Sequence, residues 1–470
     1  MQTPQLIGTA VAALGLALGL AASIHALLYK RLPQSAFGWI AVCMSLPFAG
    51  ALLYYLFGIN RVERRARALR SARRTPAAPP DDAAAPPGSE SMAALGAAVS
   101  GRPLVGGNRV VPLHNGEQAF PAMLEAIAGA AARVYLSTYI FEGNRTGRQF
   151  VDALGAAAAR GVDVRVLLDG VGELYSRPRA SELLARAGVR HARFVPPKLL
   201  PPELHVNLRN HRKILAVDGR VGFTGGMNIG DRHLAADTAN PRRVVDLHFR
   251  LEGPVVAQME GVFLDDWEFV TGDRAEPPAA PAAAPAANGA LCRVVADGPD
   301  GDLDRLRALL VGAIGAARRR VAIMTPYFLP PREVTGALQA AALRGVDVAV
   351  VLPAKNNLPY IHWATRHALW ELLQRGVQVL YQPPPFVHSK LLLVDDHYAL
   401  IGSANIDARS LRLNFELDVE VYDWALVADL DRHFTAVRAR STPVTLADVD
   451  ARPLPRRLLD GVAWLFSPYL

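Results

Sequence analysis

The chain contains almost no cysteine, with only Cys43 and Cys292 among its 470 residues. Two thiols, one of them inside a hydrophobic run, cannot form a disulfide framework, so the sequence does not require an oxidising compartment. A length of 470 residues also exceeds what one ordinary hydrophobic core supports, which predicts two or three domains.

Charge is absent from two stretches near the N-terminus. Residues 1–29 and 35–60 contain no Asp, Glu, Lys or Arg. Each stretch can cross a hydrocarbon core of about 30 Å as a helix, and the short separation predicts a hairpin of two transmembrane helices. Under the positive-inside rule, the arginines that follow place both termini, and the domains after them, in the cytoplasm. These arginines are Arg61, Arg64, Arg65, Arg67, Arg70, Arg73 and Arg74.

Two distant segments carry one polar pattern, which reads His-x-Lys, four residues, Asp, six residues, Gly-Gly or Gly-Ser, one residue and Asn. Two copies at the same spacing predict a duplicated site. The first copy holds His211, Lys213, Asp218 and Asn228, and the second holds His388, Lys390, Asp395, Ser403 and Asn405.

These residue types suit phosphoryl transfer through a covalent histidine. A neutral imidazole is a nucleophile near neutral pH, and its cation is an acid. Attack on a phosphodiester expels an alkoxide that needs a proton, so one histidine should attack while the other donates. We assign a catalytic role to His211, Lys213, Asp218, His388, Lys390 and Asp395. Asn228, Asn405 and Ser403 are predicted to bind the phosphate oxygens, where negative charge builds up.

No metal site and no cofactor are predicted, because a lysine two residues after each histidine would repel a cation. Each imidazole also needs a partner on its second nitrogen. Asp246, 35 residues after His211, and Glu416, 28 residues after His388, are predicted to orient the histidines. Asp218 and Asp395 follow strands, so we expect them to brace the loops and lysines more than to transfer protons.

The two halves repeat outside the motifs as well. Residues 134–141 correspond to 321–328, and residues 160–168 correspond to 344–352. Helical periodicity alternates with short apolar runs, which predicts an α/β sandwich with a largely buried mixed sheet in each half. The C-terminal stretch is amphipathic, and both an interfacial helix and a helix docked on the protein core are open. The predicted boundaries are two transmembrane helices at 1–60, a basic juxtamembrane segment and Ala/Pro-rich tether at 61–105, a first domain at 106–274, a Pro/Ala linker at 275–289 and a second domain at 290–470.

The motifs resemble those of the phospholipase D superfamily and, within it, the bacterial cardiolipin synthases. The resemblance rests on Asn210–Ile214, Gly225–Gly230, Gly402–Asp407 and the terminal Ser467-Pro468-Tyr469-Leu470, and it covers nearly the whole chain. It implies two pseudo-symmetric phospholipase D-like domains whose motifs meet at one site. The chain departs from the pattern at Asp231–Leu234, where an acidic residue followed by an aromatic one is expected.

The resemblance implies transfer of a phosphatidyl group between two phosphatidylglycerol molecules, giving cardiolipin and glycerol through a phosphohistidine. Motif order in the family favours His211 as the nucleophile; the residues alone leave this open. It also implies a multi-pass protein of the bacterial inner membrane, with phosphatidylglycerol and cardiolipin as its lipid partners.

Three alternatives remain open at this point. A membrane-bound phospholipase D would use water or another alcohol as acceptor, and product analysis separates it from a synthase. A nuclease, and with it a nucleic-acid partner, is not expected, since the positive charge is concentrated beside the membrane segment and no aromatic-plus-basic platform is evident. A membrane scaffold with a relic site conflicts with two intact motifs.

Overall fold

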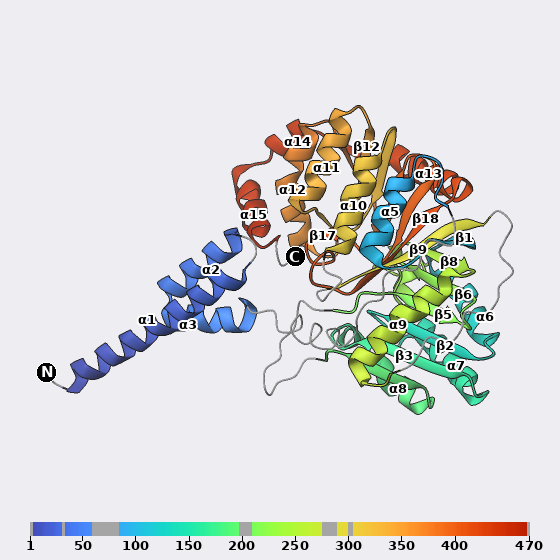
Figure 1. The fold of residues 1–470 in the computed structure, drawn as a ribbon, viewed down its shortest axis with the longest axis horizontal. Coiled ribbons are helices and arrows are strands. Elements are labelled where there is room, and N and C mark those ends of the chain that lie inside the picture. The colour runs from blue at the N-terminus through green and yellow to red at the C-terminus, as the bar shows by residue number, and fades with distance from the viewer. Residues whose placement is uncertain are drawn as a thin grey trace. The chain divides into compact units, whose positions relative to one another are not determined.

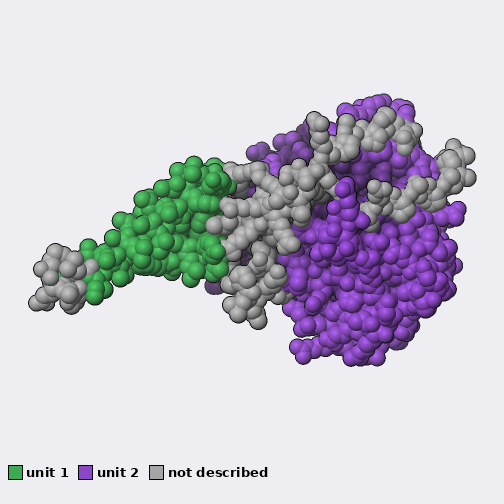
Figure 2. Space-filling view, turned by 60° about the horizontal axis from the view of Figure 1, so that its bottom comes forward, with its two compact units in different colours: residues 1–69, 198–204 green, residues 70–197, 205–470 purple. Residues whose placement is uncertain are grey.

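The computed structural model describes residues 3–30, 33–58, 84–196, 209–274, 289–298 and 304–467. The chain forms two compact units, residues 1–69 with 198–204 and residues 70–197 with 205–470 (Figures 1 and 2). The predicted arginine cluster, nearly all of the Pro/Ala linker and the last three residues lie outside the described residues.

The first unit contains one long helix and one broken helical segment. Helix α1 is apolar and long enough to cross a membrane over Ile7–Tyr29. The second uncharged run is not one helix, because Pro47 lacks the N–H that a continuous helix needs and begins a new helix there. Of the two predicted transmembrane helices, only the first is a single helix of sufficient length and apolar character among the described residues. The elements are α1 (Thr3–Tyr29), α2 (Pro33–Ser45), α3 (Pro47–Leu53) and the π-helical turn η1 (Tyr54–Gly58), and both α2 and α3 pack against α1.

The second unit is built on one mixed sheet of fifteen strands. Strands β1 (Val105–His114) and β9 (Ala290–Asp297) pair antiparallel at its centre. The first half continues outward through β8 (Leu247–Glu252), β6 (Val221–Gly225), β5 (Ile214–Val217), β2 (Arg133–Thr138), β3 (Asp163–Asp169) and β4 (Arg190–Phe194). The second half continues through β18 (Glu416–Tyr422), β16 (Tyr398–Gly402), β15 (Leu391–Val394), β10 (Arg320–Met324), β12 (Asp347–Pro353), β13 (Gln378–Gln382) and β19 (Thr442–Val444).

The predicted pair of α/β halves is confirmed, with the difference that both halves share this sheet. Strands β5 and β15, which carry the motifs, are buried along their whole length. Helices pack on both halves of the sheet (Figure 1). They are α6 (Asn115–Ala128), α7 (Arg145–Ala159), α8 (Ala180–Arg186) and α9 (Val255–Thr271), followed by α10 (Arg305–Ala316), α11 (Arg332–Leu343), α12 (Pro359–Leu373), α13 (Trp424–Ala439), α14 (Leu446–Asp450) and α15 (Leu454–Leu465).

The predicted flexible tether does not extend to residue 105. Residues Glu90–Ser100 form helix α5, which ends at Gly101 in the left-handed conformation. Met92 and Ala93 are buried in a core shared with α10, and the buried guanidinium of Arg293 donates to the Ala93 carbonyl at 2.7 Å. The Ala-rich composition suggested a linker, but alanine is also the strongest helix former, and here it allows close packing.

Asp218 and Asp395 brace equivalent turns at the ends of β5 and β15 that lie away from the histidines. Asp218 adopts a φ of 53°, and its carboxylate accepts the backbone N–H groups of Ala131, Ala132 and Arg133 at 2.8 Å. Asp395 has a φ of 54° and accepts those of residues 318–320 in the same way. Neither carboxylate is near the imidazoles in the hydrogen-bond network, so the catalytic assignment of these two residues gives way to the bracing role.

We predict that Asp218→Ala lowers the free energy of unfolding by about 2 kcal/mol, because three N–H groups lose a charged acceptor and alanine disfavours positive φ. Partial burial raises the pKa of Asp218, but the three N–H donors outweigh it and hold this pKa below its usual range. The deficit should therefore be complete above about pH 4 and shrink as the pH falls through the lower folded pKa. Denaturant unfolding at several pH values measures it. Asp218→Asn, which keeps an acceptor oxygen, is the matched control; an equal loss there would contradict the prediction.

Candidate active site

Each motif histidine lies just before a buried strand and is held by backbone from the other half of the unit. The His211 N–H donates to the Phe415 carbonyl at 2.9 Å, and the His388 N–H donates to the Val245 carbonyl at 2.8 Å. The second contact belongs to a short parallel pair of β14 (Phe386–Val387) with β7 (Val244–Val245). The two motifs therefore meet, and the first residue of each motif is hydrogen-bonded to the backbone of the other half.

The two carboxylates predicted to orient the imidazoles do contact them, but in exchanged order. His211 Nδ1 lies 3.1 Å from Glu416 Oε2, and His388 Nδ1 lies 3.0 Å from Asp246 Oδ2. Separation along the sequence predicts the pairs Asp246 with His211 and Glu416 with His388, which is wrong. Strand β8 follows Asp246 and strand β18 begins at Glu416, and the two strands lie on opposite sides of the central pair β1 and β9. Each carboxylate therefore faces the motif of the opposite half.

The lysines are fixed beside the histidines. Lys213 Nζ donates to the His211 carbonyl at 2.7 Å, and Lys390 Nζ donates to the His388 carbonyl at 2.7 Å. Burial lowers the pKa of Lys213 to about 7 and that of Lys390 to about 8, although the charges of Glu416 and Asp246 oppose this. The two lysine side chains thus lie in a buried space beside Glu416 and Asp246, where their positive charge can bind a phosphate anion.

Both imidazoles are neutral at neutral pH in the absence of substrate. Burial lowers the pKa of His211 to about 4, despite the attraction of Glu416. Burial, followed by the charges of Lys390 and Lys213, holds the pKa of His388 well below its usual range, and a charge on His211 contributes in the same direction.

The two carboxylates differ in protonation, and one residue of the motif accounts for part of this difference. Burial raises the pKa of Asp246 to about 7, against the charge of Lys390. Burial acts on Glu416 too, but contacts with His211, Lys213 and Ser403 outweigh it and keep the Glu416 pKa below its usual range. Ser403 Oγ donates to Glu416 Oε2 at 2.6 Å. The equivalent residue of the first motif is Gly226, where any Cβ would overlap Asp246 Oδ1.

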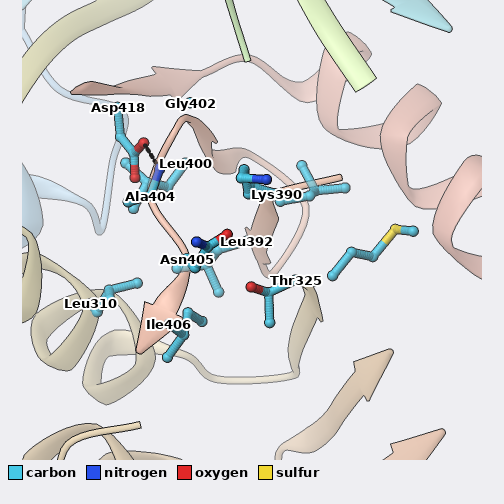
Figure 3. Close-up of a pocket in the computed structure, with 12 residues that line it drawn as sticks. Leu310, Thr325, Lys390, Leu392, Leu400, Gly402, Ala404, Asn405, Ile406 and Asp418 are labelled. Carbon is cyan, nitrogen blue, oxygen red and sulfur yellow. Dashed lines mark hydrogen bonds between the residues drawn. The ribbon is translucent and has the colours of Figure 1, made fainter. Parts of the chain in front are cut away.

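The predicted phosphate-binding residues are placed differently from one another. Ser403 is fully buried, and its hydroxyl is engaged by Glu416, so it orients the carboxylate instead of facing a phosphate. Asn228 Oδ1 accepts the Ile140 N–H at 3.1 Å, while Asn405 Nδ2 donates to Ser410 Oγ at 3.1 Å. A small cavity beside the second motif is lined by Lys390, Asn405, Thr325 and Asp418, among other residues (Figure 3).

Sequence reasoning missed Arg212, the residue between His211 and Lys213. Its buried guanidinium donates to the Glu416 carbonyl and to the Asp297 carbonyl, both at 3.0 Å, and forms an ion pair with Asp266. Arg212 therefore ties the first motif to two strands of the second half. Its place in the motif gave no signal, because the equivalent position of the second motif is Ser389.

Three more residues beside the histidines were also missed. His233 is buried with Nδ1 3.9 Å from Asp246 Oδ2, and its Nε2 accepts the Asn228 N–H at 3.2 Å. It lies in η3 (Asp231–His233), where the sequence departs from the family pattern. The Tyr139 ring lies 5.2 Å from the His211 ring, and the Tyr327 ring lies 6.2 Å from the His388 ring. Both tyrosines closely follow strands that repeat between the halves, which was the available signal.

Among the described residues, no group of three or more His, Cys, Asp and Glu side chains is arranged to hold a metal ion. The site residues that the structure brings together are His211, Lys213, Asp246, His388, Lys390, Ser403 and Glu416. This arrangement offers two neutral imidazoles, each oriented through Nδ1, with fixed positive charge nearby. Such a set can attack a phosphodiester and can protonate or deprotonate the departing or entering alcohol.

Comparisons with known proteins agree with this chemistry. A family described as "Cardiolipin synthase, PLD-like domain" matches residues 123–267 and 310–438, and a family described as "Phospholipase_D-nuclease N-terminal" matches residues 17–58. The chain is 35% identical over 466 residues to cardiolipin synthase A of Pseudomonas aeruginosa (strain LESB58), covering 96% of this chain and 94% of that protein. It is 32% identical over 456 residues to the cardiolipin synthase of Geobacillus thermodenitrificans, covering 94% and 90%.

Among solved structures, phosphatidylserine synthase of Haemophilus influenzae is similar in fold. The TM-score is 0.63 at 16% identity, and the alignment covers 81% of this chain and 100% of that chain. At this identity the likeness supports the fold of the two halves and no more.

We predict that each histidine responds to the carboxylate of the opposite half. In protein labelled with ¹⁵N-histidine, Glu416→Gln should shift the Nδ1 resonance of His211, and Asp246→Asn should shift that of His388, because each substitution weakens one charge-assisted hydrogen bond. His211→Gln and His388→Gln assign the two signals. An Asp246→Asn variant that perturbs His211 and leaves His388 unchanged would contradict the crossed pairing.

Proposed function

Because the chain belongs to the cardiolipin synthase family of phospholipase D-like proteins, we propose that it transfers a phosphatidyl group from one phosphatidylglycerol to another, releasing glycerol and forming cardiolipin. The enzyme is a phosphatidyltransferase that acts on phospholipids in the membrane. The observation that carries the proposal is the crossed pair of contacts, His211 with Glu416 and His388 with Asp246. Both contacts use Nδ1; Lys390 Nζ also lies 3.1 Å from His388 Nε2, so a substrate at this nitrogen would replace that contact.

The different protonation of the two pairs supports His211 as the nucleophile. Glu416 is ionised and holds the proton of His211 on Nδ1, so Nε2 presents a lone pair. The raised pKa of Asp246 lets the Asp246–His388 pair keep one additional proton near neutral pH. Since the two groups titrate as a pair, this proton is available to a departing oxygen through His388 Nε2.

In the first step, His211 Nε2 forms a bond to the phosphorus of the donor lipid, and the bond from phosphorus to the glycerol headgroup oxygen breaks. His388 gives this oxygen a proton, and glycerol leaves. Lys213 and Lys390 stabilise the charge that develops on the non-bridging oxygens. The phosphatidyl group remains on His211 as a phosphohistidine.

In the second step, the terminal hydroxyl of another phosphatidylglycerol enters the place that glycerol left. His388 accepts the hydroxyl proton, the oxygen attacks phosphorus, and the bond to His211 Nε2 breaks. One phosphodiester has been exchanged for another, so the reaction needs no nucleotide and is reversible. Asp218 and Asp395 support both steps only through the turns that they brace.

The first helix and the matched N-terminal family segment associate the protein with the membrane. We propose that the broken second segment, α2 with α3, returns across the bilayer, which makes the protein multi-pass. The arginines at 61–74 favour a cytoplasmic position for both termini and for the catalytic unit in the bacterial inner membrane.

Hydrolysis is the second candidate, because a water molecule in place of the acceptor alcohol would convert the same intermediate to phosphatidic acid. We predict that the full-length protein in phosphatidylglycerol vesicles produces cardiolipin and glycerol in equal amounts, as measured by lipid mass spectrometry and a glycerol assay in buffer with a chelator. The double variant His211→Ala with His388→Ala should lower the rate by at least about 10³-fold. Phosphatidic acid as the only product would refute the synthase and favour hydrolysis.

We predict that a donor lipid whose leaving group needs no proton distinguishes the roles of the two histidines. With phosphatidyl-p-nitrophenol as donor, His388→Ala should still release about one nitrophenol per enzyme and hold a phosphatidyl group, because attack by His211 requires no acid there. His211→Ala should release none in this burst. Stopped-flow absorbance and intact-protein mass spectrometry measure the two quantities. The reverse result would assign the nucleophile to His388.

A further inference from the structure

The C-terminal helix α15 is fastened to the second half in one fixed rotation. Asp460 is fully buried and accepts from the Arg366 guanidinium at 2.6 Å, and it also pairs with Arg452. Ala463 is buried against α12, and the Trp464 ring lies 5.1 Å from the His367 ring. Figure 1 shows α15 alongside α12. A buried carboxylate with two guanidinium partners is costly to move, so α15 cannot roll to bury another face.

This rotation leaves the apolar side of α15 uncovered. Leu458 is 61% exposed and Leu465 is 67% exposed, although leucine is usually buried. The spacing of the exposed apolar residues follows one helical stripe, and Arg456 and Arg457 are exposed on the same helix. We call the exposed apolar residues the α15 stripe, which comprises Leu454, Leu458, Leu459, Val462, Leu465 and Phe466.

An apolar cluster connects α15, the helix that carries the stripe, to the region of the second histidine. Ala463 belongs to an apolar cluster with Leu329 and Ile361, and Tyr327 packs against this cluster. The Tyr327 ring in turn lies 6.2 Å from the His388 ring. The helix that carries the stripe therefore supports one wall of the active site.

The first half offers a smaller apolar tip beside the other histidine. Leu174 and Tyr175, in η2 (Gly172–Tyr175), are 51% and 60% exposed. The Tyr175 ring lies 6.3 Å from the Tyr139 ring, which contacts His211. The tip and the helix that carries the α15 stripe are thus each connected through a tyrosine ring, Tyr139 or Tyr327, to a motif histidine.

We propose that the α15 stripe and the Leu174–Tyr175 tip form a surface that seats the catalytic unit on an anionic bilayer, with their apolar side chains in the headgroup region. A large apolar stripe flanked by arginines on a surface helix is the pattern of an interfacial helix, and exposed tyrosine is typical of the membrane–water boundary. Arginine at this level attracts anionic lipid. The proposal rests on membrane association and on the proposed phospholipid substrates, but its test reads lipid contact and not activity.

Two features favour a bilayer over a protein partner. The apolar residues lie on both halves beside the site, whose proposed substrates are lipids, so a bilayer contact would let a phosphatidyl group enter without crossing water. A protein bound to both places would instead cover this entrance. The α15 stripe also lies next to cations, which matches an anionic lipid surface better than a second copy of this basic chain.

Site-directed fluorescence in nanodiscs tests the contact without any activity assay. Cys43 and Cys292 are buried, so a cysteine introduced in the full chain can be labelled selectively. Leu458→Cys would carry an environment-sensitive dye in nanodiscs of phosphatidylglycerol and phosphatidylcholine with a lipid spin-labelled near the headgroup. Leu18→Cys in α1 is the control for membrane contact. Arg432→Cys, exposed on α13, is the control for a water-facing helix.

We expect the dye at Leu458 to be quenched to at least about half the extent seen at Leu18 and the dye at Arg432 to show little quenching. Tyr175→Cys should follow Leu458. Quenching at Leu458 no greater than that at Arg432 would overturn the proposal. A blue-shifted emission that the lipid quencher leaves unchanged would also overturn it, since this would mean that the α15 stripe is covered by a second copy or by the chain's own N-terminal helices.

Discussion

Two buried carboxylates, each reaching an imidazole of the opposite half, are the constraint on which this site depends. Glu416 and Asp246 lie on or beside strands next to the sheet centre, and each completes a motif to which it does not belong. Loss of either carboxylate would leave buried cationic groups without compensation, which typically costs about 3–5 kcal/mol. Neither half therefore contains a working site alone, and the duplication is functional only as a pair.

The duplicated halves have also diverged in a way that gives them different tasks. At the residue after the first motif glycine, the second half has Ser403 and the first half has Gly226. The serine hydroxyl helps to keep Glu416 ionised, whereas Asp246 lacks such a hydroxyl and has a raised pKa. One pair of groups is thus suited to attack and the other to hold a proton. Under the proposed mechanism, the Ser403 hydroxyl contributes to the difference between the nucleophile and the acid, together with the contacts of Glu416 to His211 and Lys213.

Much of the fold could be predicted from the sequence, because repeated motifs at fixed spacing leave few alternatives to two similar halves with one shared site. The halves, the buried strands β5 and β15 and the four site residues His211, Lys213, His388 and Lys390 followed from the repeats. Asp246 and Glu416 were chosen by their distance after the motifs, and Ser403 was expected to contact phosphate. The crossed pairing did not follow from the repeats, since separation along the chain says nothing about which strand edge lies nearer. The roles of Arg212 and His233 were not predicted, because neither residue is repeated in the other half. Helix α5 was not predicted, because its alanines are compatible with a linker as well as with a helix. Pro47 was a sequence signal for a break in the second helix, but the prediction of one spanning helix there relied on the absence of charged residues.

The pairing of β1 with β9 has a further consequence for the order of events. One continuous sheet and the contacts of Arg212 join the two halves and hold the two motifs together. Under the proposed reaction, the departing glycerol and the incoming alcohol occupy the same place beside His388. Glycerol must therefore leave before the second lipid binds, and the covalent adduct has to persist through that exchange.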